Sequence, residues 1–280
     1  MKKLTGLILL LTMTLGLFTA FPSPTNASNF GITCLDPNKA VSTILSGSKK
    51  NSVKYNVVKS KMTLYIDGKS KLNIDCEFAD VWLYHVNSTT TLISVFYFNK
   101  NDICVDKIYR YDGSKLVYLD DIGYILTSNT GFTQIYPEDA GNNEFFCWCV
   151  REEPSLGIYS IDAKFKYNTS SKKISKATNT YNVFLEGIDG AKPGKKGGWQ
   201  DNWGTASKSF KTYTKAGGST LSFSVNKGDR LRVQQVDIQT KAVYFQVKNK
   251  QGKIGWYKDP KKWSENNVYF FMEAMTLDDM

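Results

Sequence analysis

Histidine is almost missing from this 280-residue chain, which contains only His85. A zinc hydrolase or a histidine-paired cysteine enzyme would have to rest on this one side chain. His85 ends an alternating segment that starts at Val81, so it is expected to point away from Trp82 and Tyr84 as an ordinary strand residue. The Gly-x-Ser-x-Gly elbow, the phosphate-binding P-loop and the dinucleotide fingerprint are also absent. The sequence therefore predicts a protein that is not an enzyme.

Paired acidic residues do not change this prediction. Asp120-Asp121 and Glu152-Glu153 could nominally supply the acid and base of a glycosidase. Adjacent strand residues point to opposite faces of a sheet, however, and Glu152-Glu153-Pro154 is typical of a solvated turn. The segment Asn99–Asp102 lacks the closely spaced acids of a calcium loop. No metal and no cofactor are expected.

Long hydrophobic runs are absent except at the N-terminus. Two lysines precede an apolar stretch from Leu7 to Phe18, prolines follow it, and Thr25-Asn26-Ala27 places small residues just before a cut at Ser28. These are the parts of a secretory signal. The stretch is too short to span about 30 Å of hydrocarbon comfortably, which argues against an uncleaved anchor. The sequence predicts a signal peptide over residues 1–27, a secreted, extracellular protein that could be associated with the cell wall, and no later transmembrane segment.

The five cysteines are an odd number, so any disulfide pairing leaves at least one thiol over. Cys147 and Cys149 alternate in a strand-like run and should face the same way, with a spacing that suits neither a zinc knuckle nor a redox pair. Cys76 and Cys104 lie in apolar strand patterns. Small buried hydrophobic side chains are favoured over disulfides.

The formal charge of +10 favours anionic partners such as nucleic acid, teichoic acid or acidic glycans. The lysines are spread along the chain, however, and form separate pairs at 49–50, 172–173, 195–196 and 261–262. Scattered lysines mostly serve solubility and the protection of edge strands. No specific nucleic-acid binding is predicted.

Helical periodicity is confined to Pro37–Leu45, which is predicted as a short amphipathic helix. Elsewhere, short runs of β-branched and aromatic residues alternate with turn residues. Met62–Ile66 and Leu72–Cys76 should form a hairpin around Asp67-Gly68-Lys69. Further strands are expected at Val81–Val86, Thr91–Phe98, Ile103–Tyr111 and Leu116–Leu119.

Two segments, Ile108–Leu116 and Phe165–Ile174, share an aromatic strand, a polar turn and a strand that opens with lysine. A period near 50 residues with about four strands has the size of a propeller blade. The pattern resembles FG-GAP and integrin-type propeller repeats. Two units cannot close a ring of roughly four to eight blades, so a β-sandwich is an equally open alternative. A mostly β domain with two blade-like units is therefore predicted over residues 28–186.

Glycine and proline are concentrated in residues 187–204, which predicts a linker or a long exposed loop. Trp199 and Trp203 lie within it. Tryptophans in such a position more often dock a loop against a neighbouring domain than anchor a ligand.

Residues 205–280 carry a second pattern. Lys227-Gly228-Asp229 opens a Leu/Val strand, an aromatic–valine strand follows, and Gly252–Trp256 closes the unit. This pattern resembles bacterial SH3 domains, which implies a small SH3-like β-barrel, here followed by an aromatic C-terminal tail that includes Trp263 and Tyr269. Strand alternation predicts an inward-facing set with Trp256 as a structural plug: Leu231, Val233, Val243, Phe245, Val247 and Ile254.

The two parts together resemble secreted proteins of clostridia-type bacteria, which bring no activity with them. The sequence favours a binding protein whose barrel recognises wall peptide, glycan or a protein partner. The alternative is a structural or host-contact protein whose β domain is the interaction surface and whose barrel is a spacer. Outward barrel positions that could stack on a ligand beside an anionic group are Tyr213, Tyr244, Tyr257, Lys215 and Lys248.

Overall fold

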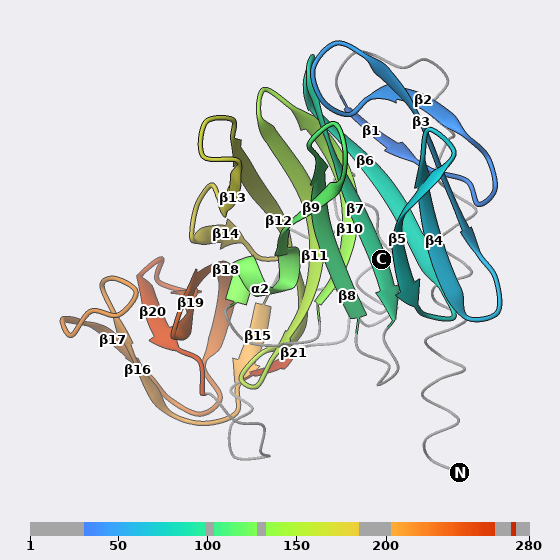
Figure 1. Ribbon diagram of the computed structural model, residues 1–280. Helices are drawn as coiled ribbons and strands as arrows, with labels where there is room; N and C mark the ends of the chain where they lie inside the picture. The colour runs from blue at the N-terminus through green and yellow to red at the C-terminus, as the bar shows by residue number, and fades with distance from the viewer. Residues whose placement is uncertain (1–30, 99–103, 128–132, 185–202, 261–269, 273–280) are drawn as a thin grey trace, which may run out of the picture.

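The computed structural model describes residues 31–98, 104–127, 133–184, 203–260 and 270–272. The predicted signal peptide and almost all of the predicted linker lie outside these residues. The described chain is mostly β, as the sequence predicted, and its one helix is the short α2 (Ile122–Thr127). Four antiparallel sheets succeed one another across the molecule, from the blue strands to the orange and red ones (Figure 1).

The first sheet pairs its four strands in chain order: β2 (Val41–Ile44), β3 (Lys50–Val57), β4 (Lys61–Ile66) and β5 (Lys69–Asp75). The predicted hairpin is confirmed, since Ile66 pairs with Lys69 around Asp67 and Gly68. Both turn residues have positive φ, 51° and 74°, which an Asp-Gly hairpin turn requires.

The predicted helix over residues 37–45 is wrong, because residues 41–44 form β2 and pair with β3. Val41, Thr43 and Ile44 are β-branched, and such residues lose side-chain freedom in a helix but fit a pleated sheet. Val41 and Thr43 face the core from alternate positions. The apparent helical spacing thus came from a short strand and its flanking residues.

The second sheet has the order β1-β6-β7-β8-β9. Its strands are β1 (Gly31–Cys34), β6 (Ala79–Asn87), β7 (Thr90–Phe98), β8 (Cys104–Tyr111) and β9 (Leu116–Asp121). The four strands predicted between residues 81 and 119 are confirmed. β1 precedes the first sheet in the chain but belongs to the second sheet, where it pairs with β6.

The third sheet again pairs four consecutive strands in order: β10 (Thr133–Gly141), β11 (Glu144–Glu153), β12 (Gly157–Asn168) and β13 (Lys173–Lys176). The sequence predicted two four-stranded units between residues 28 and 186, whereas the hydrogen-bonded strands form three sheets. The repeat signal lay in the hairpins that end the second and third sheets. The first sheet ends in a similar hairpin, with Tyr65 in its first strand, Asp67-Gly68 in its turn and Lys69 opening the next strand, but the prediction did not count it as a unit.

The fourth sheet has the order β17-β16-β20-β19-β18-β15-β21, and β14 also pairs with β18. Its strands are β14 (Thr180–Asn182), β15 (Trp203–Ala206), β16 (Phe210–Tyr213), β17 (Leu221–Val225), β18 (Arg230–Gln239), β19 (Ala242–Asn249), β20 (Ile254–Lys258) and β21 (Phe270–Met272). Within the described residues this path stays open at β17 and at β21. β14 and β15 lie on either side of the undescribed residues 185–202 and share this sheet.

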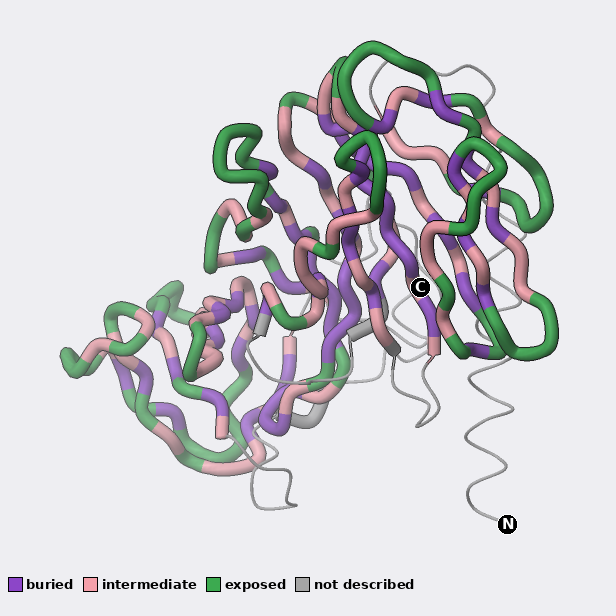
Figure 2. The backbone as a smooth tube through the Cα atoms, viewed as in Figure 1, coloured by how far each residue is buried: buried purple, intermediate pink, exposed green. Residues whose placement is uncertain are grey.

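Two buried clusters hold the sheets together, and they appear as the purple stretches of Figure 2. Val81 and Leu83 of β6 belong to the cluster between the first and second sheets. Tyr84 and Val86 point the other way, into the cluster shared by the second, third and fourth sheets. β6 is therefore covered on both faces, which explains why its sequence is almost continuously apolar.

The larger cluster joins the sheets through aromatic contacts. Tyr84 of the second sheet packs against Phe145 of the third with ring centroids 4.7 Å apart. Cys147 and Cys149 are fully buried free thiols on the same side of β11, as the sequence predicted. Cys147 Sγ lies 3.2 Å from the Tyr84 hydroxyl, so a thiol here fills space and completes a polar contact.

Candidate functional site

Strand register decides which residues of the fourth sheet face outward. Residues directly opposite each other in an antiparallel pair lie on the same face. Phe245, which is fully buried, is opposite Tyr257, and Gln246 is opposite Trp256. Tyr257 is accordingly only 2% exposed and belongs to the core, while Trp256 is half-buried and points outward. The predicted outward orientation of Tyr257 is wrong, and so is the predicted role of Trp256 as an inner plug.

Gly255 explains this inversion. It lies opposite Val247 and faces the core, where a Cβ would overlap Thr212 Oγ1. A glycine that faces the core adds no apolar side chain to the sequence pattern. The alternation therefore predicted that Ile254 and Trp256 face inward, whereas Gly255 and Tyr257 do. Ile254 was predicted inside for the same reason but is 46% exposed.

The outward side of β16, β19 and β20 brings three aromatic residues together. Tyr213 lies directly opposite Trp256, and Trp256 lies directly opposite Gln246. Tyr244 is two residues from Gln246 on the same side of β19. All three aromatic residues are half-buried, which leaves part of each ring accessible. We call Tyr213, Tyr244 and Trp256 the aromatic face.

Lysines border the aromatic face. Lys258 lies opposite Tyr244, and Lys248 follows Tyr244 on the same side of β19. Lys215 is exposed in the β16–β17 loop, where a Cβ added to Gly217 (φ +68°) would lie 3.4 Å from the Tyr244 hydroxyl. The structure therefore brings Tyr213, Tyr244, Lys215 and Lys248 to one side of the sheet.

Of the five residues predicted for a ligand site, Tyr257 alone lies elsewhere, in the core. Trp256 was missed as a site residue. Its position opposite Tyr213 depends on a β16–β20 pairing that no local pattern reveals.

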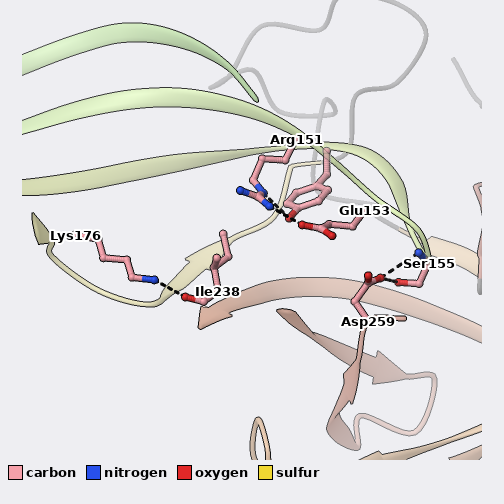
Figure 3. Close-up of polar contacts among 7 residues, drawn as sticks. Arg151, Glu153, Ser155, Lys176, Ile238 and Asp259 are labelled. Atoms are coloured by element: carbon pink, nitrogen blue, oxygen red, sulfur yellow. Dashed lines mark hydrogen bonds and ion pairs between the residues drawn. The ribbon is translucent and has the colours of Figure 1, made fainter. Parts of the chain in front are cut away.

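A second polar constellation lies where the third and fourth sheets meet (Figure 3). Ser155, in the β11–β12 turn, donates its backbone N–H to Asp259 Oδ1 over 3.0 Å and its hydroxyl to the same oxygen. The Tyr257 hydroxyl lies 3.0 Å from Ser155 Oγ. These three residues are buried, so their hydrogen bonds replace contacts with water and fix the two sheets to each other.

Arg151 and Glu153 form a buried ion pair beside this contact, with Nη2 and Oε1 2.5 Å apart and side chains 3% and 14% exposed. Arg151 Nε also donates to the Tyr159 hydroxyl over 3.1 Å. Lys176 Nζ donates to the Ile238 carbonyl over 2.5 Å (Figure 3). The expectation of a solvated turn at Glu152-Glu153-Pro154 is wrong for the last two residues, because Glu153 turns inward and only Glu152 is exposed.

The Asp259 carboxyl should make this junction sensitive to pH. Burial raises its pKa from 3.8 to about 7, with the Glu153 carboxylate adding to the effect and the hydrogen bonds from Ser155 opposing it. Below the unfolded value of 3.8 the stabilisation is fully present. As the pH rises through about 7 it is lost, because the folded state holds a proton that the unfolded state has released.

Asp259→Asn removes this titration and keeps a group that accepts from Ser155. We expect the free energy of unfolding of the wild type to fall between pH 4 and 7 relative to that of the variant, by at most about 1.4 kcal/mol per pH unit. Urea unfolding at several pH values measures the difference. Parallel profiles for the two proteins would contradict the prediction. Asp106, whose pKa burial also raises to about 7, is the same in both and cancels.

His85 has a structural place. Its Nδ1 lies 3.0 Å from Thr91 Oγ1, and its Nε2 lies 3.0 Å from Thr33 Oγ1. The Thr91 hydroxyl donates to the Ile44 carbonyl, so it accepts from a protonated Nδ1, and Nε2 accepts from Thr33. Burial lowers the pKa of His85, which favours this neutral form. The side chain thus ties β1 to the strands beside it.

Within the described residues, no group of three or more His, Cys, Asp or Glu side chains could hold a metal ion. No helix in the same part of the chain is long and apolar enough to cross a membrane. Comparisons with protein-family models, with curated proteins and with solved structures found nothing that matches this chain.

Proposed function

We propose that the protein is a secreted, non-enzymatic binding protein whose fourth sheet recognises wall peptide, glycan or a protein partner through the aromatic face. One observation carries the proposal: Tyr213 and Trp256 lie directly opposite each other, with part of each ring accessible and with Tyr244 nearby. Adjacent accessible rings offer a stacking surface at little entropic cost. Tyrosine and tryptophan are also the residues most enriched among binding hot spots.

The sequence patterns support the same reading. The N-terminal segment has the features of a secretory signal, which would bring the chain to the cell envelope. The antiparallel strands β16 to β20 carry the turns that resemble a bacterial SH3 domain. The three preceding sheets, each with at least four strands, favour the blade-like description over a sandwich, which has two packed sheets.

The alternative places the interaction surface on the preceding sheets and makes the fourth sheet a spacer. Accessible aromatic residues there give it a specific basis: Tyr118 of β9 is 51% exposed, and Tyr124 of α2 is 61% exposed. These residues supply a matched control, because a double tyrosine change can be made on either surface.

Binding to purified cell-wall sacculi tests the proposal. We expect Tyr213→Ala/Tyr244→Ala to weaken retention at least about tenfold, since a stacking aromatic residue is often a hot spot. Tyr118→Ala/Tyr124→Ala should bind like the wild type. Melting curves must show that both double variants are folded. Full retention by the folded Tyr213/Tyr244 variant, or loss in the control instead, would refute binding through the aromatic face.

A further inference from the structure

The outward side of the fourth sheet carries cations arranged around its aromatic residues. Arg232 of β18 lies directly opposite Lys248 of β19, and Lys258 of β20 lies directly opposite Tyr244. Lys248 and Lys258 are therefore about 13 Å apart along the strand direction, at roughly 3.3 Å per residue. Trp256 lies between these two levels, so rings and cations alternate along the sheet.

The Arg232–Lys248 pair is unfavourable for the isolated protein. Like charges directly opposite each other in a sheet repel. Among the described residues, neither Arg232 nor Lys248 has an ion-pair partner, and the same holds for Lys258. Arg232 and Lys248 are half-buried and Lys258 is exposed, so all three charges are accessible from solvent. An anion placed between Arg232 and Lys248 would turn this repulsion into attraction.

Acidic groups do not balance these cations. Among the outward positions of β18, β19 and β20, only Asp237 is acidic. Asp237 lies opposite Tyr244 and accepts a hydrogen bond from Thr180 Oγ1 over 3.1 Å, so it is held toward β14. The side of the sheet that carries Arg232, Lys248 and Trp256 is therefore positive.

We propose that the aromatic face binds a linear anionic carbohydrate polymer, whose sugar rings stack on Trp256 and Tyr213 and whose acidic groups lie between Arg232 and Lys248. This inference rests on the proposed function and narrows its ligand to a charged glycan. Stacking requires a ring with an apolar face, and charge complementarity requires an anion at intervals along the chain. A neutral glycan would leave the Arg232–Lys248 repulsion in place.

Dextran sulfate and uncharged dextran are the first probes, used with the mature protein. We expect dextran sulfate to bind at least tenfold more tightly than dextran, and its affinity to fall as salt rises. Arg232→Gln/Lys248→Gln should lose at least tenfold in affinity for dextran sulfate. The control Lys50→Gln/Lys61→Gln removes two exposed cations from the first sheet and should change it less than twofold. Equal binding of both dextrans, or equal losses in both variants, would overturn the proposal.

Lys248→Glu tests the same site if the Arg232→Gln/Lys248→Gln variant is too unstable to measure. It places opposite charges at the Arg232–Lys248 position, so the melting temperature should be maintained or raised while dextran sulfate binding is lost. Retained binding in this folded variant would refute the site.

Competition then separates the sources of the charge. Phosphorylated dextran tests phosphate and polygalacturonate tests carboxylate, and competition by at least one is expected. Competition by neither, or tighter binding of single-stranded DNA than of either, would overturn the assignment to a charged glycan. If the tyrosine variant loses sacculus binding while the charge variants do not, the proposed function stands and this inference fails. If the tyrosine variant binds sacculi fully, the proposed function itself fails.

Discussion

Tyr257→Ala is expected to lower the free energy of unfolding by roughly 3–5 kcal/mol, the cost of emptying a large aromatic site in a core. The Tyr257 ring packs 5.1 Å from the ring of Phe210 and 5.7 Å from that of Phe245. Its hydroxyl reaches Ser155 of the third sheet. The substitution therefore leaves a cavity and also removes a hydrogen bond between two sheets.

Trp256→Ala is the matched comparison, because the two residues are neighbours on β20 and face opposite ways. It should cost only about 1–2 kcal/mol, since Trp256 is half-buried on the outward side. Tyr257→Phe isolates the hydroxyl and should cost about 1 kcal/mol. Urea unfolding of the three variants measures these values. A larger loss for Trp256→Ala than for Tyr257→Ala would show that Trp256, and not Tyr257, faces the core.

The ion pair at the junction of the third and fourth sheets should give the second large effect. Glu153→Leu leaves the Arg151 charge buried, with the Tyr159 hydroxyl as its remaining hydrogen-bond partner among the described residues. Removing one partner of a buried pair typically costs about 3–5 kcal/mol. Arg151→Met should cost a similar amount, because Glu153 then loses its cation.

The double variant Arg151→Met/Glu153→Leu distinguishes a buried pair from two independent residues. Replacing both partners by apolar side chains is often close to neutral. We expect the double variant to be more stable than either single variant, which a double-mutant cycle on unfolding free energies measures directly. Additive losses would mean that the pair does not act as a unit.

Much of the strand content was predictable, since alternation with a period of two marks half-buried strands clearly. The β4–β5 hairpin was placed correctly because Asp67-Gly68 marks a tight turn, although β5 begins at Lys69, which had been assigned to the turn. The outward face of the fourth sheet was predictable only in part. Tyr213 and Tyr244 follow from alternation within their own strands, whereas Trp256 and Tyr257 were exchanged because Gly255 hides the phase of β20.

The junction between the third and fourth sheets was beyond sequence reasoning for a different reason. Ser155 and Asp259 are 104 residues apart, and neither local sequence pattern indicates that the two residues are in contact. Glu153 was interpreted from its neighbours as solvated, but its burial follows from Arg151 beside it and from the fourth sheet above. The local sequence indicates strand and turn propensity, but pairing between distant strands determines whether a charged side chain is buried or exposed.

The order of the strands also has a consequence for how the chain folds. The first and third sheets are each built from four consecutive strands joined by short turns, so their contacts are local and can form early. The contacts of Tyr159 with Phe245, and of Ser155 with Asp259, close loops of many tens of residues and must form late. Until then the third sheet exposes an apolar surface around Tyr159, so a folding chain is prone to aggregate at this surface before the fourth sheet covers it.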